Sequence, residues 1–100
     1  MNQDPIFDPP RSLFPLGQIV TTPGALKALT DFDVDPMSLI RRHNDGDWGD
    51  VDEFDAQQNR FAIRTGLRIL SSYSITDIVT IWIITEADRT ATTILLPEEY

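Results

Sequence analysis

The chain has 100 residues, of which 41% are hydrophobic, and its 16 acidic and 8 basic side chains give a formal net charge of -8. This length and apolar content predict one domain with a single core. The absence of cysteine excludes disulfides, thiolate catalysis and cysteine-based zinc sites. The longest apolar run covers residues 81–84, far fewer than the roughly 20 residues that cross a bilayer.

The charge balance disfavours direct binding of nucleic acid. Lys27 is the only lysine, and acidic residues outnumber the arginines around them, so phosphate would be repelled. A protein partner with a basic surface fits better. The N-terminus lacks the basic start and apolar core of a secretory signal, which leads us to expect a cytoplasmic protein. Nothing in the sequence predicts a cofactor or a membrane interaction.

Residues 1–12 carry three prolines among polar side chains and are predicted to form a flexible N-terminal arm. Residues 13–100 are predicted to form one α+β domain. Its first element is a short β-rich run over residues 16–21.

Two helix starts carry the same signal, a capping residue followed by proline at the first helical position: Thr22-Pro23 and Asp35-Pro36. The first helix is expected to run to about Thr30, with Leu26 and Leu29 facing inward. The second is expected to end at about His43.

Residues 44–50 have the composition of a turn, with two glycines around a single tryptophan. Asp50 or Asp52 then caps a predicted third helix, which Gly66 ends. Its expected inward face contains Phe54, Phe61 and Ala62.

Three β-rich segments follow at about residues 67–75, 78–85 and 90–96, and their short connections predict antiparallel hairpins. The middle segment is apolar on both faces, which predicts a central strand. Its expected faces are Val79, Ile81 and Ile83 on one side and Ile78, Trp82 and Ile84 on the other. The predicted fold is therefore a short strand, about three helices, and a three-stranded antiparallel meander with the helices on one face.

The densest cluster of candidate site residues is acidic, with six carboxylates in eleven residues: Asp45, Asp47, Asp50, Asp52, Glu53 and Asp55. Such oxygen ligands suit calcium, but the spacing does not follow an EF-hand loop. Counting from Asp45, the third ligand would be Gly49, and Ala56 would stand at the closing glutamate. The remaining alternatives are helix-capping acids in a solvated loop and a partner-binding surface.

The aromatic residues leave alternatives open. Trp48, within the acidic loop, is either folded back as a lid on the core or exposed as an anchor for a partner. Trp82 and Tyr73 are expected to pack in the core or across strands, because they lie in β-rich segments.

His43 is the only histidine, so a histidine general base would have to be this residue. With Glu86, Asp88 and Arg89 it could form a metal-independent ribonuclease site, in which arginine holds the phosphate. The alternative interpretation is a positively charged helix C-terminus and a charged hairpin turn.

Several segments are familiar: LFPLGQIVTTPGAL, RHNDGDWGD, GLRILSSY and WIITEADRTATTILLPEEY. Over residues 13–100 the chain resembles a family of short "plasmid-related" proteins of proteobacterial plasmids and integrative elements, sometimes labelled type I restriction subunit M. Relatives carry glycine where this chain has Ile78, so the turn before the middle strand is expected to differ. The resemblance transfers no catalytic residues. The methyltransferase label fits poorly, because Arg11 follows Asp8-Pro9-Pro10 where a base-flipping motif has an aromatic residue.

The sequence therefore favours a small acidic accessory protein of a mobile genetic element that binds another protein without catalysis. A sharper version is an anti-defence inhibitor of a CRISPR or restriction complex. The alternative is the ribonuclease-like enzyme that uses His43 and Arg89. Residues of the expected partner surface are Asp45, Asp47, Trp48, Asp50, Glu53, Glu86, Asp88 and Arg89.

Overall fold

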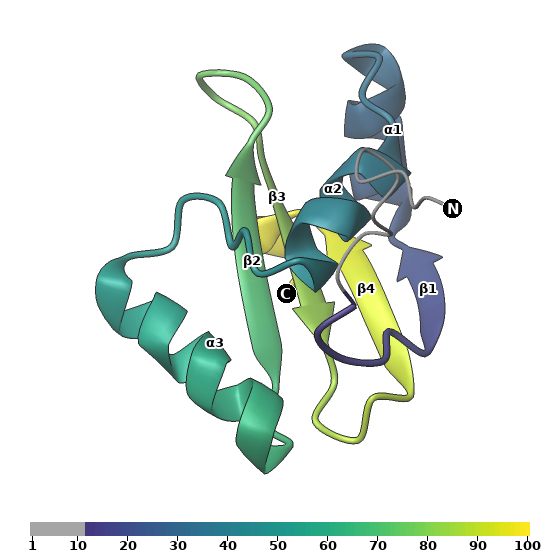
Figure 1. Ribbon diagram of the computed structural model, residues 1–100. Helices are drawn as coiled ribbons and strands as arrows, with labels where there is room; N and C mark the ends of the chain where they lie inside the picture. Colours follow the sequence, from purple (N-terminus) through teal and green to yellow (C-terminus); the bar gives the residue numbers. More distant parts are fainter. Residues whose placement is uncertain (1–11) are drawn as a thin grey trace, which may run out of the picture.

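The computed structural model describes residues 12–100, which form a four-stranded sheet with three helices on one side (Figure 1). Apart from Ser12, the predicted N-terminal arm lies outside the described residues. The elements in chain order are β1 (Gln18–Thr21), α1 (Pro23–Asp31), α2 (Pro36–Asn44), α3 (Glu53–Thr65), β2 (Ile69–Ser74), β3 (Thr80–Thr85), β4 (Ala91–Leu95) and the 3-10 helix η2 (Pro97–Glu99). The predicted α+β class and element order are confirmed.

The sheet has the strand order β1-β4-β3-β2. β2, β3 and β4 form the expected antiparallel meander, with Ser71 opposite Ile83 and Ile83 opposite Ile94. β1 is parallel to β4, so the sheet is mixed, which the sequence did not predict. Nothing local in the sequence encodes a pairing between strands some 70 residues apart. None of the helices among residues 12–100 is long and apolar enough to cross a membrane.

The predicted helix starts are confirmed by the hydrogen bonds of their capping side chains. The side chain of Thr22 accepts a hydrogen bond from the amide of Ala25 at 3.2 Å, and Asp35 accepts from Met37 at 3.0 Å. Of the two candidates for the third cap, Asp52 is the cap, because its carboxylate accepts from the amide of Asp55 at 2.8 Å. The third helix ends at Gly66, which takes the left-handed conformation with φ 75°.

Two of the predicted helix faces are wrong in part. Leu29 is buried, but Leu26 is 52% exposed, and the small Ala25 takes the inward position instead. On α3, Phe54 and Phe61 are 67% and 46% exposed. α3 approaches β2 through smaller side chains, so its large aromatic residues point away from the sheet; the buried residues of α3 are Ala56, Asn59 and Ala62.

The core lies between the helices and the inner face of the sheet. Ile81 and Ile83 of the central strand β3 are fully buried there, and Tyr73 of β2 is 2% exposed. The predicted central strand begins later than expected, because Ile78 lies in the hairpin turn and is 91% exposed. Trp82 lies on the opposite face of β3, as the strand alternation predicts.

The C-terminal residues cover the opposite face of the sheet, where η2 lies behind the strands in Figure 1. The ring of Tyr100 packs edge-on against Trp82 with 5.9 Å between centroids. Glu99 fixes this segment to the start of α1, since its carboxylate accepts from the Thr22 hydroxyl at 2.5 Å and the Gly24 amide at 3.2 Å. These bonds, led by that from Thr22, lower the pKa of Glu99.

Candidate functional site

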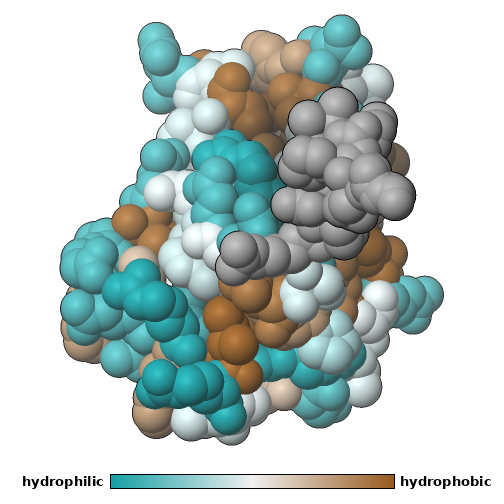
Figure 2. Space-filling model, viewed as in Figure 1, coloured by the Kyte–Doolittle hydropathy of each residue, from teal (hydrophilic) through white to brown (hydrophobic). Residues whose placement is uncertain are grey.

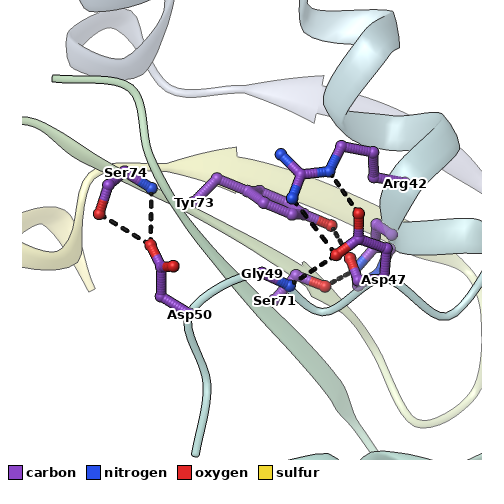
Figure 3. A network of polar contacts seen from close by, with 8 residues as sticks. Arg42, Asp47, Gly49, Asp50, Ser71, Tyr73 and Ser74 are labelled. Carbon is purple, nitrogen blue, oxygen red and sulfur yellow. Dashed lines mark hydrogen bonds and ion pairs between the residues drawn. The ribbon is translucent and has the colours of Figure 1, made fainter.

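The acidic loop, residues 45–52 between α2 and α3, is hydrogen-bonded to the outer edge of β2 (Figure 3). The amide of Ser72 donates to the carbonyl of Trp48 at 3.0 Å, and the amide of Asp50 donates to the carbonyl of Ser72 at 2.6 Å. The carboxylate of Asp50 accepts from both the amide and the hydroxyl of Ser74, at 3.0 and 2.8 Å. Gly49 permits this approach with φ 75°, because a Cβ there would lie 2.1 Å from the carbonyl oxygen of Ser72.

Asp47 organises the other end of the loop. Its carboxylate accepts two hydrogen bonds from Arg42, at 2.7 and 3.3 Å, and one from the amide of Gly49 at 3.2 Å. The bonds from Arg42 are the main reason that the pKa of Asp47 is lowered. The Arg42 guanidinium also lies 4.5 Å from the centre of the Tyr73 ring, whose hydroxyl donates to the carbonyl of Asp47 at 2.7 Å (Figure 3).

The remaining acids of the cluster point to solvent. Asp52 caps α3, and Glu53 forms an ion pair with Arg60 at 2.8 Å. Asp45 and Asp55 are exposed. Among residues 12–100 no three carboxylate or histidine side chains converge in a way that could hold a metal ion. The cluster is therefore a set of capping and loop-fixing acids that leaves negative charge on the surface.

Of the two alternatives for Trp48, the structure shows the lid that is folded back onto the core. The side chain is only 6% exposed and lies 6.4 Å from the Phe14 ring and 6.0 Å from His43. The predicted role as an exposed partner anchor is wrong, because the backbone bonds on either side hold this turn against β2 with the ring directed into the core. Trp48 belongs to the smaller of two core clusters, with Phe14, Ala56, Ala62 and Ile69.

His43 is fully buried between α2 and the sheet, and both ring nitrogens have side-chain partners. Nδ1 lies 2.6 Å from the hydroxyl of Ser71, and Nε2 lies 2.9 Å from that of Thr85. Thr85 bonds Thr92 at 2.7 Å, and Thr92 donates to the carbonyl of Leu16 at 2.7 Å. Because that carbonyl can only accept, the Thr92 hydroxyl donates to it and accepts from Thr85, and the Thr85 hydroxyl in turn accepts from Nε2 of His43. Neutral His43 therefore carries its proton on Nε2, and its Nδ1 accepts from the Ser71 hydroxyl.

This environment opposes the general-base role. Burial lowers the pKa of His43 to about 3, which keeps the ring neutral. A neutral imidazole can act as a base, but here its lone pair already accepts from Ser71, and no ring atom is exposed to a substrate. His43 instead connects α2 to β2, β3 and β4 through one polar chain.

The side chain of Arg89 is also bound within the fold, to backbone carbonyls. Its guanidinium donates to the carbonyls of Leu67, Ala62 and Glu86 at 2.7, 2.9 and 3.1 Å, so it caps the C-terminal end of α3. The Phe14 ring lies between Arg89 and His43, at 5.7 Å from the guanidinium and 5.3 Å from the imidazole. The structure therefore lends the predicted ribonuclease pair no support, because His43 is fully buried and the guanidinium of Arg89 is bound to carbonyl oxygens.

The neighbouring acids of the β3–β4 turn behave as turn residues. Asp88 accepts from the amide and hydroxyl of Thr90, at 3.0 and 2.6 Å, and the hydroxyl bond is the main cause of its lowered pKa. Glu86 is exposed and contributes its carbonyl to Arg89. Both carboxylates add to the negative surface without forming an acid–base pair.

The sequence did not predict the buried polar residues of the fold, chiefly Ser71, Thr85, Thr92 and Asn59. The available signal was a polar residue at an inward-facing position in each of three apolar strands. A histidine near the end of a preceding helix is a natural partner for such hydroxyls. A surface hollow of about 410 Å³, open to solvent, has side chains of both charge signs in its lining: Ser38, Arg41, Arg42, Asp45 and Asp47.

No protein-family model, curated protein or solved structure matches this chain.

Proposed function

We propose that this protein is a non-catalytic accessory protein that binds a basic protein partner through its exposed carboxylates. The observation that carries the proposal is an imbalance in how its charges are used. Every Asp and Glu of residues 12–100 is exposed. Of the seven lysine and arginine side chains of residues 12–100, four are engaged: Lys27, Arg42 and Arg60 are in ion pairs with Asp31, Asp47 and Glu53, and Arg89 binds carbonyls. The three others, Arg41, Arg64 and Arg68, are exposed.

The densest part of this charge is the acidic surface, which we define as Asp45, Asp50, Asp52, Glu53 and Asp55. Its acids are held by a loop fixed to β2 and by the first turn of α3. Figure 2 shows mostly hydrophilic surface in the region of α3. Because these carboxylates lie on a fixed loop and at a helix start, the acidic surface presents its negative charge in a fixed geometry and steers a basic partner.

The resemblance to plasmid-related proteins suggests the setting, an accessory protein of a mobile genetic element. The sharper version of the proposal is an anti-defence inhibitor. A fixed array of carboxylates would compete with nucleic-acid phosphates for the basic groove of a CRISPR or restriction complex.

The test begins with capture of partners by the tagged protein from a bacterial host and continues with association kinetics on the purified partner. The variant Asp45→Asn/Asp55→Asn removes two charges from the acidic surface, at exposed side chains that form no hydrogen bond or ion pair with residues 12–100. The matched control, Asp33→Asn/Asp77→Asn, removes two exposed charges from other turns. We expect the first variant to slow association and flatten its salt dependence, and the control to have the smaller effect. Equal effects, or association that is insensitive to salt, would contradict the proposal.

A further inference from the structure

The two edges of the sheet are treated in opposite ways. On β2, the residues that face away from β3 all have partners. Leu70 exchanges two bonds with the Asn59 side chain, at 3.1 and 2.7 Å, and Ser72 bonds the acidic loop. The amide of Ser74 donates to Asp50. This edge is closed to any further strand.

The β1 edge is open within the described part of the chain. β1 is the terminal strand of the sheet and pairs only with β4. The amides of Gln18 and Thr22 donate toward β4, at 3.0 and 2.9 Å. Because strand residues alternate in direction, the amides and carbonyls of Ile19 and Thr21 face outward. Ile19 and Val20 are 37% and 39% exposed, and Figure 2 shows hydrophobic surface at the right-hand edge, where β1 lies in Figure 1.

Both ends of this open edge carry negative charge. At the start of β1, Gln18 bonds Thr90, whose side chain and amide bond the carboxylate of Asp88. At the end of β1, the Thr22 hydroxyl donates to Glu99, and Glu98 is exposed beside it in the sequence. The basic residues around these acids have partners of their own: Arg89 binds carbonyls, Lys27 pairs with Asp31, and Arg68 donates to the Tyr100 hydroxyl.

We propose that β1 accepts an extended, basic segment of the partner as a fifth strand of the sheet. The inference rests on the proposed function and adds a second contact with the same partner, at the sheet edge opposite the acidic surface. Backbone groups of Ile19 and Thr21 supply the ladder bonds, and apolar side chains on one face of the segment contact either Ile19 or Val20, which lie on opposite faces of the sheet. Asp88 and the C-terminal glutamates favour flanking lysine or arginine. A second copy of this chain is disfavoured as the occupant, because each copy carries a net charge of -8.

The test uses the whole protein and a synthetic peptide of alternating valine and lysine as the probe. One control peptide has glutamate in place of lysine. Another is the basic peptide methylated on two adjacent central amides, which blocks ladder bonds on both of its edges and leaves its charge unchanged. Binding is followed by two-dimensional NMR of the backbone amides and by their hydrogen exchange.

We expect the basic peptide to shift the amides of Ile19 and Thr21 and to slow their exchange. Methylation should weaken binding about tenfold or more, because the methyl group that faces β1 removes one ladder hydrogen bond and blocks the close approach that the neighbouring bonds need. Ile19→Pro should have a similar effect, since its amide makes no bond to β4 and proline is tolerated on an edge strand. The methylated peptide keeps the test independent of whether that variant folds.

Different failures have different meanings. If the basic peptide binds with shifts confined to residues 45–55 and methylation has no effect, strand addition at β1 is wrong while a basic partner remains supported. If the glutamate peptide binds as well as the lysine peptide, the charge argument of the proposed function is wrong too. Sedimentation that shows a dimer with protected Ile19 and Thr21 amides before any peptide is added would overturn the choice of occupant.

Discussion

Replacement of His43 by glutamine should remove much of the pH dependence of stability below pH 6.5. The imidazole is fully buried, and burial lowers its pKa from 6.5 to about 3. Glutamine keeps a polar side chain near Ser71 and Thr85 but cannot titrate. The comparison therefore isolates one ionisation from those of the carboxylates, which both proteins share.

The size of the effect follows from linkage between proton binding and folding. Between pH 6.5 and about 3, the histidine of the unfolded chain binds a proton that the folded chain excludes. The stabilisation is thus complete above pH 6.5 and is lost as the pH falls. The loss is about 1.4 kcal/mol per pH unit, or about 5 kcal/mol over the whole interval. Such a loss is comparable to the total stability of a small domain.

Urea unfolding between about pH 4.5 and 7.5, followed by tryptophan fluorescence, gives the free energy of unfolding of both proteins. The glutamine variant should be less stable near neutral pH by about 1–3 kcal/mol, because one buried hydroxyl loses its partner. Its stability should fall less steeply with acid than that of the wild type. Parallel curves would refute the buried neutral histidine, as would an imidazole NMR signal that titrates above about pH 5.

Three further predictions follow from burial and backbone geometry. Ile83→Ala should cost about 2–5 kcal/mol of unfolding free energy, because Ile83 is fully buried, while Ile78→Ala, at a 91% exposed position, should cost less than about 0.5 kcal/mol; similar losses would contradict the strand assignment. Gly49→Ala should destabilise more than Gly66→Ala in the same urea assay, although φ is 75° at both, because only the Cβ at residue 49 meets backbone, at 2.1 Å; equal costs would argue against the close approach of this loop to β2. Trp48→Ala should lower the free energy of unfolding by about 3–5 kcal/mol in chemical denaturation, because the side chain is buried. A variant as stable as the wild type would contradict the burial of Trp48.

Local chemistry explains what the sequence predicted well. The caps Thr22 and Asp35 and the left-handed Gly66 act through hydrogen bonds or backbone angles within a few residues, so they can be predicted from the local sequence. The meander is similarly local, because short turns join its strands. These features account for the correct element order.

The errors come from contacts between distant parts of the chain. Hydrophobicity alone favoured Phe54 and Phe61 for the inward face of α3, yet Asn59 takes an inward position because its amide matches the open backbone of Leu70. The parallel pairing of β1 with β4 depends on the same kind of long-range fit. Trp48 was ambiguous because its direction is decided by the bonds of its turn to β2, which no local pattern encodes.

The proposal of a basic partner is tested most directly by the association rate of the wild-type protein with its captured partner at about 50 and about 300 mM salt. Screening shortens the range of charge interactions across this interval, so steering by exposed carboxylates predicts a markedly slower association at the higher salt. The same measurement on Asp45→Asn/Asp55→Asn should show a lower rate at the lower salt and a weaker dependence. An association rate that is unchanged by salt in both proteins would contradict the proposal that this acidic domain recognises its partner by charge.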